Sequence, residues 1–371
     1  MKLGIFAPML GRDSGGPGTY EEQLIRHLAG AMPDSELHVW CSREGAPLLP
    51  PDAGNIARHC WQPRLRLPSV VLGMPWAMRR HRLDLAHATF VPAPWLPLDY
   101  VFTVHDLSPI LQPEFYKPHL RRRLSYLIRR GITGARVVLC ISETTRGHVV
   151  EQFGVDAERL AVAYHGVDPR FCPGDVAAAR ARLEDALGLR GRYVLFLGKI
   201  EARKNIARLL EAFAALRANG NRDLTLVLAG RRHWGMQDID QRIARLGLEG
   251  TVLETGYVPD TLVVDLYRGA EVMIFPSLWE GFGLPLIEAM ACGTPVVTSN
   301  ASCLPEVAGG AALEFDPLDV DAMAAALGRA CTDDALRATL RERGHARARA
   351  FTWQATAAAT VRAYQQALAL G

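Results

Sequence analysis

Val272-Met-Ile-Phe-Pro-Ser-Leu-Trp-Glu-Gly-Phe-Gly-Leu-Pro-Leu-Ile-Glu288 is the stretch of this chain that says most about its fold. Its first four residues are apolar without alternation, which is typical of a strand buried on both faces of a parallel sheet. Gly281 and Gly283 permit a tight turn, and residues 284–291 have the pattern of a short helix. A glycine turn that opens a helix presents backbone N–H groups and the positive end of the helix dipole. The stretch therefore predicts a strand, a turn suited to a phosphate, and a helix.

Two glutamates, Glu280 and Glu288, flank this turn. Carboxylates repel a phosphate, so we expect both side chains to face hydroxyl groups beside it. Hydroxyls next to phosphates indicate a sugar nucleotide. The alternative is an ordinary strand–turn–helix unit whose acidic side chains are solvated.

Strand-like and helix-like segments alternate along the whole chain. The expected buried strands are 3–8, 37–41, 84–88, 101–104, 136–141 and 160–163, followed by 193–198, 224–229, 252–255, 271–275, 295–298 and 312–315. Amphipathic segments such as 20–31 and 205–218 lie between strands. This alternation predicts parallel sheets with helices on both faces.

A Pro- and Gly-rich segment, 166–174, separates the two series of strands. We therefore expect an α/β fold of two Rossmann-like doubly wound domains, residues 1–168 and 169–352. The last helical stretch is expected to return to the first domain, as residues 353–371. Ligands of such sheets bind beyond the carboxyl ends of strands, here in a deep cleft between the domains.

Composition excludes several other classes of protein. The 371 residues are 49% hydrophobic and 22% charged, and the net charge of +3 gives no reason to expect a nucleic-acid partner. The seven cysteines are scattered without C-x-x-C pairs, so neither a disulfide framework nor a zinc site is indicated. No window reaches the roughly 18 apolar residues of a membrane span. We expect a cytoplasmic protein.

Gly15-Gly-Pro-Gly-Thr-Tyr20 lies between the first strand and the first helix. Glycine there, Gly16 included, permits close approach of the backbone to an anion, although an ordinary loop explains the pattern as well. A dinucleotide fingerprint requires a third glycine three residues after Gly18, where this chain has Glu21. The pattern therefore does not favour a dehydrogenase.

Gly198-Lys-Ile-Glu-Ala-Arg-Lys-Asn205 follows the strand that begins the second series. Only four of the 42 basic residues are lysines, and two of them, Lys199 and Lys204, lie in this loop. Cations at the start of a helix are unfavourable unless an anion neutralises them. We therefore expect Lys199 and Lys204 to bind a phosphate, the alternative being charge at a helix end.

Two histidines lie where ligands can bind, one at the end of a strand and one in the linker. His105-Asp106 lies at the carboxyl end of strand 101–104, where a histidine can donate to a sugar hydroxyl. The alternative is a histidine that caps the strand through Asp106. His165 precedes Gly166-Val-Asp168 in the linker, which could be only a turn.

Together these residues resemble the retaining glycosyltransferases of family 4, which have the GT-B architecture of two facing Rossmann-like domains. The most specific match is the E-x7-E motif formed by Glu280 and Glu288. The other matches are Gly15–Tyr20, His105-Asp106, Arg203-Lys204-Asn205 and Gly166-Val167-Asp168.

The resemblance implies a role for each matched residue. Glu280 contacts the donor sugar, Glu288 the ribose hydroxyls, and His105 the sugar near its anomeric carbon. The diphosphate or sugar is bound by Gly16, Arg203, Lys204 and the backbone of Phe282, Gly283 and Leu284. The family often has arginine at the position of Lys199 and asparagine at that of His165, so this chain departs there.

The resemblance also implies retention of anomeric configuration, with the departing phosphate assisting deprotonation of the acceptor. We expect no metal or other cofactor, because cations and amides neutralise the leaving group. Asp238-Ile-Asp240 has the form of a D-x-D metal motif, but it begins a helix, where acidic residues complement the dipole. Asp319-Val-Asp321 is interpreted in the same way.

Two apolar segments raise the question of a membrane. In Lys117–Arg130 leucines and Ile128 share one helical face and five arginines the other, a pattern typical of helices on anionic membranes. Residues 67–78 are apolar but too short to span a bilayer. Core packing under a solvated basic face explains both segments equally well.

The predicted function is transfer of a hexose, with mannose from GDP-mannose as first choice because the Arg203-Lys204-Asn205 run resembles mannosyltransferase-like members. The acceptor is expected to be a glycan or lipid-linked intermediate in cell-surface polysaccharide synthesis. The alternatives are a UDP-sugar donor, a non-catalytic protein that binds sugar nucleotides, and a hydrolase or epimerase of the same fold.

Overall fold

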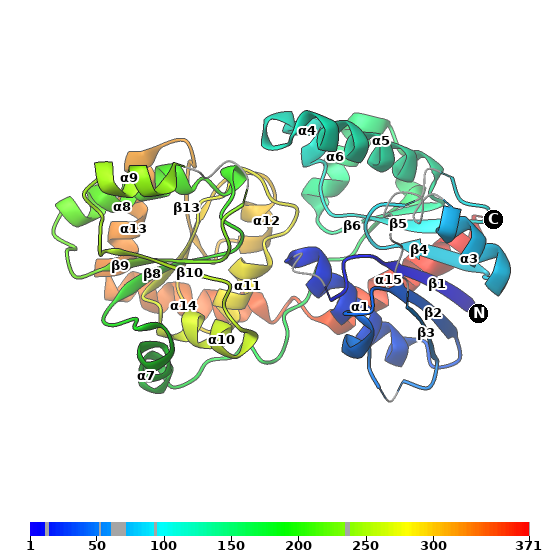
Figure 1. The fold of residues 1–371 in the computed structure, drawn as a ribbon, viewed down its shortest axis with the longest axis horizontal. Coiled ribbons are helices and arrows are strands. Elements are labelled where there is room, and N and C mark those ends of the chain that lie inside the picture. The colour runs from blue at the N-terminus through cyan, green and yellow to red at the C-terminus, as the bar shows by residue number, and fades with distance from the viewer. Residues whose placement is uncertain (12–14, 52, 61–71, 93–94, 234–237, 371) are drawn as a thin grey trace. The chain divides into compact units, whose positions relative to one another are not determined.

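The computed structural model describes residues 1–11, 15–51, 53–60, 72–92, 95–233 and 238–370 (Figure 1). Contacts between Cα atoms divide the chain into two compact units. The first contains residues 1–166 with 352–371, and the second contains residues 167–351. Among the described residues, no helix combines the length and the apolar character needed to cross a membrane.

The first unit is built on a parallel sheet of seven strands in the order β3-β2-β1-β4-β5-β6-β7. Its strands are β1 (Lys2–Ala7), β2 (Glu36–Cys41), β3 (Ile56–Cys60), β4 (Leu85–Ala88), β5 (Tyr100–Val104), β6 (Val137–Cys140) and β7 (Leu160–Val162). Its main helices are α1 (Gly16–Ala31), α3 (Met74–His81), α4 (Ser108–Leu111), α5 (Pro118–Gly134), α6 (Glu143–Phe153) and α15 (Trp353–Ala369).

The second unit is built on a six-stranded sheet in the order β10-β9-β8-β11-β12-β13, again parallel. Its strands are β8 (Tyr193–Leu197), β9 (Thr225–Ala229), β10 (Val252–Gly256), β11 (Val272–Phe275), β12 (Val296–Ser299) and β13 (Leu313–Phe315). Its helices are α7 (Val176–Leu187), α8 (Ile206–Ala218), α9 (Ile239–Arg245), α10 (Asp260–Gly269), α11 (Leu284–Ala291), α12 (Leu304–Ala308), α13 (Val320–Thr332) and α14 (Asp334–Ala348).

Each sheet reverses its strand order once. The chain builds outward from β1 through β2 and β3, then returns to place β4 on the other side of β1. It builds in the same way from β8 through β9 and β10, then places β11 beside β8. Loops diverge at such a switch point, and this is where doubly wound sheets bind ligands. The expected doubly wound α/β fold is confirmed.

Twelve of the strands correspond to expected ones, and β3 is the strand that the sequence analysis missed. It pairs with β2 from Leu37↔Ile56 to Cys41↔Cys60 and forms the edge of the first sheet. Its residues are half-buried or exposed, and it carries Arg58 and His59. A polar edge strand lacks the apolar run by which buried strands are recognised.

The last helix, α15, belongs to the first unit. The Tyr364 hydroxyl lies 2.7 Å from His87 Nδ1 on β4, and Thr356 donates a 2.6 Å bond to the Tyr164 carbonyl. Trp353 and Tyr364 are fully buried. The chain therefore completes its first unit only after it has built the second.

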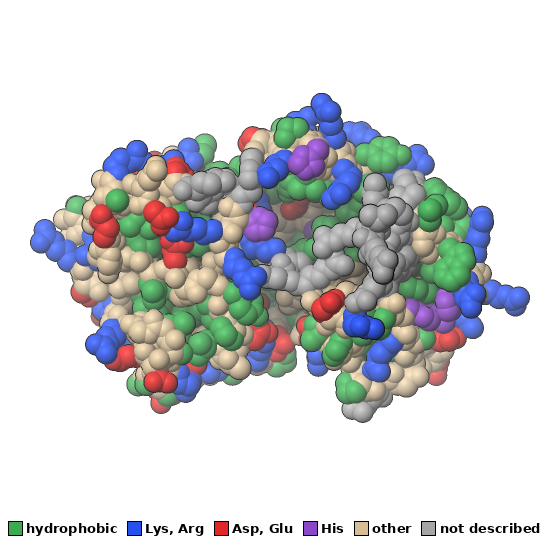
Figure 2. All heavy atoms as spheres, in the orientation of Figure 1, with side chains coloured by type: hydrophobic (Ala, Val, Ile, Leu, Met, Phe, Trp, Pro, Cys, Tyr) green, Lys and Arg blue, Asp and Glu red, His purple; other side chains and the backbone are tan. Residues whose placement is uncertain are grey.

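Basic and acidic side chains are mixed over the surface of both units on the face drawn in Figure 2. This distribution agrees with a net charge of only +3.

Candidate active site

The switch point of the second sheet brings together two loops that are far apart in sequence. One loop follows β8 and contains a single 3-10 turn, Ala202–Lys204. The other follows β11 and leads into α11. The Leu278 N–H donates a 2.8 Å bond to the Arg203 carbonyl, so the two backbones are tied to each other. Adjacent parallel strands bring their carboxyl ends to the same edge, which is why the loops meet.

Glu280 is the centre of this arrangement. Lys204 Nζ donates to one of its carboxylate oxygens, and Arg203 Nη1 donates to the other at 3.0 Å. Arg203 also donates to Glu201 at 2.5 Å and to the Trp279 carbonyl at 3.1 Å. Glu280 is 8% exposed and Lys204 6%. The predicted site residues Glu280, Arg203 and Lys204 are thus in direct contact.

The charges of this cluster determine the protonation state of Glu280. Burial raises the pKa of its carboxyl, but the charges of Lys204 and Arg203 outweigh burial and lower the pKa to about 2. Glu280 is therefore ionised at neutral pH. A carboxylate offers about four acceptor positions, so Glu280 can bind both cations and still accept a bond from a sugar hydroxyl.

The glycine turn after Glu280 fits the start of α11. Gly283 is the residue before the helix and has φ 94°, and a Cβ there would lie 2.9 Å from Leu304 Cδ2. The Phe282 ring is buried and meets the Phe351 ring edge-on at 5.6 Å. Its side chain therefore packs in the core, and only its backbone faces the turn with Gly283 and Leu284. The predicted helix at 284–291 is confirmed.

Glu288 lies in the second turn of α11, in different surroundings. The Tyr267 hydroxyl, on α10, donates a 2.8 Å bond to its carboxylate. Burial raises the pKa of Glu288 to about 7, although the Tyr267 bond and the charge of Arg170 oppose the rise. Arg170 itself pairs with Asp260 at 2.9 Å. Tyr267 and Arg170 are neighbours of the site that the sequence analysis did not identify.

Lys199 occupies the same loop as Arg203 but a different position. It is half-buried, and within the described part of the chain it pairs with neither Glu201 nor Glu280. The loop passes close to the end of β9, since a Cβ on Gly230 would lie 1.9 Å from the Gly198 carbonyl oxygen. Whether Lys199 binds a phosphate stays a prediction.

The first unit gathers the other predicted residues around Tyr20. Gly16 is exposed and begins α1, four residues before the fully buried Tyr20. The Tyr20 ring stacks on the His165 ring at 4.9 Å and meets the His105 ring edge-on at 5.1 Å. Its hydroxyl lies 2.9 Å from Thr103 Oγ1. The structure therefore brings His165, the departure from the family pattern, into contact with the predicted site.

His105 is oriented by the backbone and not by Asp106. Its Nε2 lies 2.9 Å from the Thr89 carbonyl, so Nε2 carries the proton. Burial lowers the pKa of His105, so its ring is neutral at neutral pH. Asp106 instead accepts 2.8 and 2.5 Å bonds from the backbone N–H and hydroxyl of Ser108. The alternative of a histidine that caps the strand through Asp106 is therefore wrong.

Glu21 is a buried carboxylate that the sequence analysis considered only as a missing glycine. It is fully buried on α1. It accepts a 2.8 Å bond from the Met9 N–H and a 2.6 Å bond from the Thr89 hydroxyl. Glu21 thus joins the loops that follow β1 and β4, at the switch point of the first sheet.

Aspartates of both D-x-D sequences form ion pairs or hydrogen bonds with other groups of the protein. Asp238 pairs with Arg242 at 2.6 Å, and Asp240 pairs with Arg232 at 2.5 Å. Asp238 precedes α9 without a side-chain capping bond and Asp240 lies in its first turn, so both are at the helix start as expected and also form ion pairs. Asp319 caps α13 as expected and accepts a 2.9 Å bond from the Ala322 N–H.

The basic segment forms helix α5. Leu127 and Ile128 are buried, and the five arginines at 121–123, 129 and 130 are exposed. Core packing therefore explains the apolar face, while membrane contact through the basic face stays a prediction. Of segment 67–78, residues 67–71 lie outside the described residues, and Met74 and Met78 pack in the core of the first unit.

Comparisons with known proteins identify the families that this chain resembles. The family described as "Glycosyltransferase Family 4" matches residues 14–171, and that described as "Glycosyl transferases group 1" matches residues 182–347. "O-antigen chain mannosyltransferase B" of Escherichia coli is 31% identical over 365 residues, which cover 94% of this chain and 96% of the relative. "Serotype-specific mannosyltransferase WbdA" of Escherichia coli is 31% identical over 290 residues, which cover 76% of this chain but 35% of that relative.

Solved structures show the same fold. Anabaena HepE in complex with UDP and glucose superposes with a TM-score of 0.78 at 22% identity, over 98% of this chain and 99% of that one. The two doubly wound parallel sheets, together with this solved neighbour, show the GT-B architecture of glycosyltransferases. The chain belongs to glycosyltransferase family 4 and is similar to its mannosyltransferases.

Proposed function

We propose that this protein is a retaining, metal-independent mannosyltransferase that uses GDP-mannose in the synthesis of a cell-surface polysaccharide. The observation that carries the proposal is the contact of Glu280 with Arg203 and Lys204 at the switch point of the second sheet. In this proposal the two cations and the N-terminus of α11 neutralise the diphosphate leaving group. The carboxylate held between the cations accepts hydrogen bonds from sugar hydroxyls.

Glu288 supports a nucleotide as the leaving group. Burial keeps its pKa near 7, so charging it is unfavourable in the free protein. A carboxyl kept in a position that disfavours its charge points to a functional role. Hydrogen bonds donated by two ribose hydroxyls stabilise the charged form, and this is the role that we propose for Glu288.

The ion pairs of Asp238 and Asp240 support metal independence of the reaction. Each aspartate pairs with an arginine, Arg242 or Arg232. A divalent metal at this pair has to displace two arginines. Charge on the leaving diphosphate is instead balanced by Arg203, Lys204 and backbone amides, with Lys199 as a further candidate.

The names of the relatives support mannose as the transferred sugar. Both Escherichia coli relatives are named mannosyltransferases, and GDP is the usual carrier of mannose. A UDP-sugar is the second candidate donor, because the structure of HepE contains UDP and glucose. We further propose a glycan or lipid-linked acceptor, reached in the cytoplasm at the inner face of the membrane through the basic face of α5 (Pro118–Gly134).

A donor screen followed by product analysis tests this function. The protein is melted with GDP-mannose, UDP-glucose, UDP-N-acetylglucosamine and a dTDP-sugar, and a ligand of the native state raises the melting temperature. The stabilising donor is then incubated with mannose-terminated oligosaccharides. We expect GDP-mannose to stabilise the protein and the product to keep the donor's anomeric configuration by NMR.

Three results contradict the proposal in different ways. Stabilisation by UDP-sugars alone assigns another donor. Inverted anomeric configuration excludes a retaining reaction. Donor binding without transfer to any acceptor and without hydrolysis indicates a protein that has lost catalysis.

A further inference from the structure

Three histidines meet at the outer edge of the first sheet, two strands away from its switch point. Strand side chains alternate between faces, so Glu36, His38 and Trp40 of β2 lie on one face. The register Trp40↔His59 places His59 of β3 on that same face. Helix α3 covers it, and His81 is the last residue of α3.

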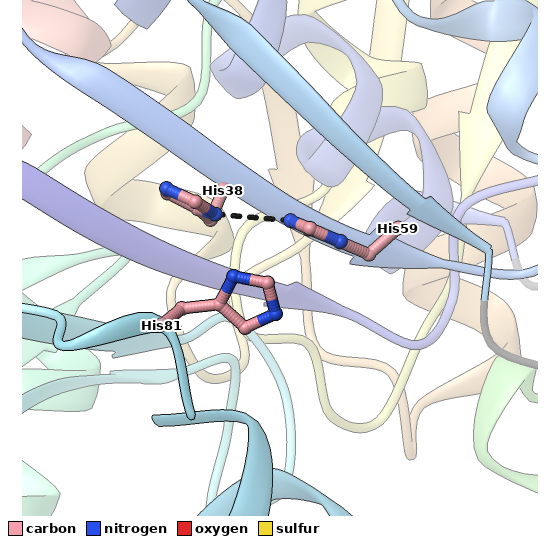
Figure 3. Close-up of side chains that lie close together, drawn as sticks. All are labelled: His38, His59 and His81. Atoms are coloured by element: carbon pink, nitrogen blue, oxygen red, sulfur yellow. Dashed lines mark hydrogen bonds between the residues drawn. The ribbon is translucent and has the colours of Figure 1, made fainter. Parts of the chain in front are cut away.

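The ring nitrogens of these histidines lie close together (Figure 3). His38 Nδ1 and His59 Nε2 face each other at 3.0 Å. The His81 ring lies beside them, with its centroid 5.0 Å from that of His38 and 4.6 Å from that of His59. One nitrogen from each ring lies within 4.8 Å of the other two.

This arrangement suits a metal ion better than it suits packing alone. Imidazole nitrogen is a common protein ligand of Zn²⁺, at about 2.0–2.1 Å, so two ligand nitrogens in a tetrahedral site are about 3.3 Å apart. His38 Nδ1 and His59 Nε2 form a hydrogen bond of 3.0 Å, and because this length is close to that value, these two rings need to move little to share an ion. His81 has to approach by about an ångström or two, and its position at a helix end permits this.

The surroundings of His38 add a second observation. The ring is buried, and its Nε2 has no well-aligned hydrogen-bond partner among the described residues. The nearest acidic atom is Glu36 Oε1 at 2.9 Å. A carboxylate beside the outer nitrogen of a ligating histidine orients the ring and fixes its tautomer. Glu36 is placed to do this while Nδ1 faces the other two histidines.

Trp40 closes one side of the cluster. Its ring stacks on His59 at 4.5 Å and meets His81 edge-on at 5.4 Å.

We propose that His38, His59 and His81 bind a zinc ion, with water in the fourth position, and that the ion fastens edge strand β3 to helix α3. The sequence analysis considered zinc only through cysteine spacing and therefore did not find this site. The ion joins His59 on β3 to His81 on α3, and such a cross-link between two elements stabilises the folded state. The ion lies outside the proposed active site, because the cluster lies on β2, β3 and α3, whereas the switch point lies between β1 and β4.

Titration of the full-length, tag-free protein with zinc tests the proposal. The protein is stripped with a chelator, exchanged into chelator-free buffer, and titrated with ZnCl₂ by calorimetry. Wild type is compared with His59→Asn, with His81→Asn and with His119→Asn, a matched control because His119 is exposed on α5. We expect one zinc per chain for wild type and control, and affinity at least roughly tenfold weaker for the two cluster variants.

Thermal melts separate binding from folding. Zinc should raise the melting temperature of wild type and control but not that of the cluster variants, whose melts in chelator should match that of metal-free wild type. Equal zinc affinity in control and cluster variants overturns the proposal. If a variant does not fold, the wild-type protein is titrated with Co²⁺ instead. A tetrahedral, nitrogen-ligated Co²⁺ ion gives visible absorption, and a titration without this absorption overturns the site.

Discussion

Glu280 and Glu288 should respond in opposite directions when each is replaced by glutamine. At Glu280, Lys204 and Arg203 outweigh burial and lower the pKa from 4.5 to about 2. At Glu288, burial raises the pKa from 4.5 to about 7. The folded protein therefore favours the charged form of Glu280 and the neutral form of Glu288.

The sign and size of each effect follow from linkage. Because one pKa unit corresponds to about 1.4 kcal/mol, charged Glu280 adds on the order of 3 kcal/mol to the free energy of unfolding. This contribution is present above pH 4.5 and is lost as the pH falls toward 2. Charged Glu288 lowers the free energy of unfolding by on the order of 3 kcal/mol at pH 8, and this penalty disappears as the pH falls from 7 to 4.5.

Urea unfolding at pH 8 and pH 5 measures both effects. Glu280→Gln should destabilise the protein by roughly 3 kcal/mol at both pH values, since it also leaves Lys204 buried without its partner. Glu288→Gln should stabilise it by roughly 3 kcal/mol at pH 8 and by less than about 1 kcal/mol at pH 5. Glu249→Gln, at an exposed position, is the control and should change little. A Glu288→Gln protein less stable than wild type at pH 8 refutes the reasoning.

Three further predictions concern binding and activity. Lys204→Ala should weaken GDP binding tenfold or more and guanosine binding little, because a charge-assisted contact contributes about 1.5–3 kcal/mol; calorimetry giving equal GDP affinity contradicts the contact. Mannosyl transfer should persist in EDTA at temperatures below the melt of the metal-free protein, whereas complete loss that Mg²⁺ restores revives Asp238 and Asp240 as ligands. Replacing the arginines at 121–123 with glutamine should weaken co-sedimentation with anionic vesicles, since each contributes about 1 kcal/mol near such a surface; unchanged binding removes α5 from membrane contact.

Most of the fold could be predicted because buried parallel strands carry unbroken apolar runs. Residues 193–197 and 272–275 are strands for this reason. The sequence analysis missed the edge strand β3, because its inward side chains include His59 and its sequence therefore has the polar pattern of a loop. The sequence analysis also missed the three-histidine cluster, since its members come from β2, β3 and α3 and are brought together only by the strand register.

The candidate site could be predicted as a set of residues but not as a set of contacts. Composition and spacing identified Lys204 and Glu280, and the family resemblance added Arg203. Their ion pairs nevertheless depend on β8 and β11 being neighbours in the sheet. Tyr267 could not be predicted as a site residue, because its hydroxyl contacts Glu288 from another helix and its local sequence gives no sign of this contact. Which side chains from separate helices and strands form hydrogen bonds or ion pairs depends on tertiary packing. A local sequence pattern does not show this packing.

The division of roles between Glu280 and Glu288 is tested most directly by calorimetric titration of wild type and of the two glutamine variants with GDP and with GDP-mannose. Glu288→Gln should weaken both ligands, because the ribose is common to them. Glu280→Gln should bind GDP as well as wild type or better, since Arg203 and Lys204 are then released from their carboxylate partner, while kcat falls strongly. The account is contradicted if Glu280→Gln loses affinity for GDP as severely as Glu288→Gln does.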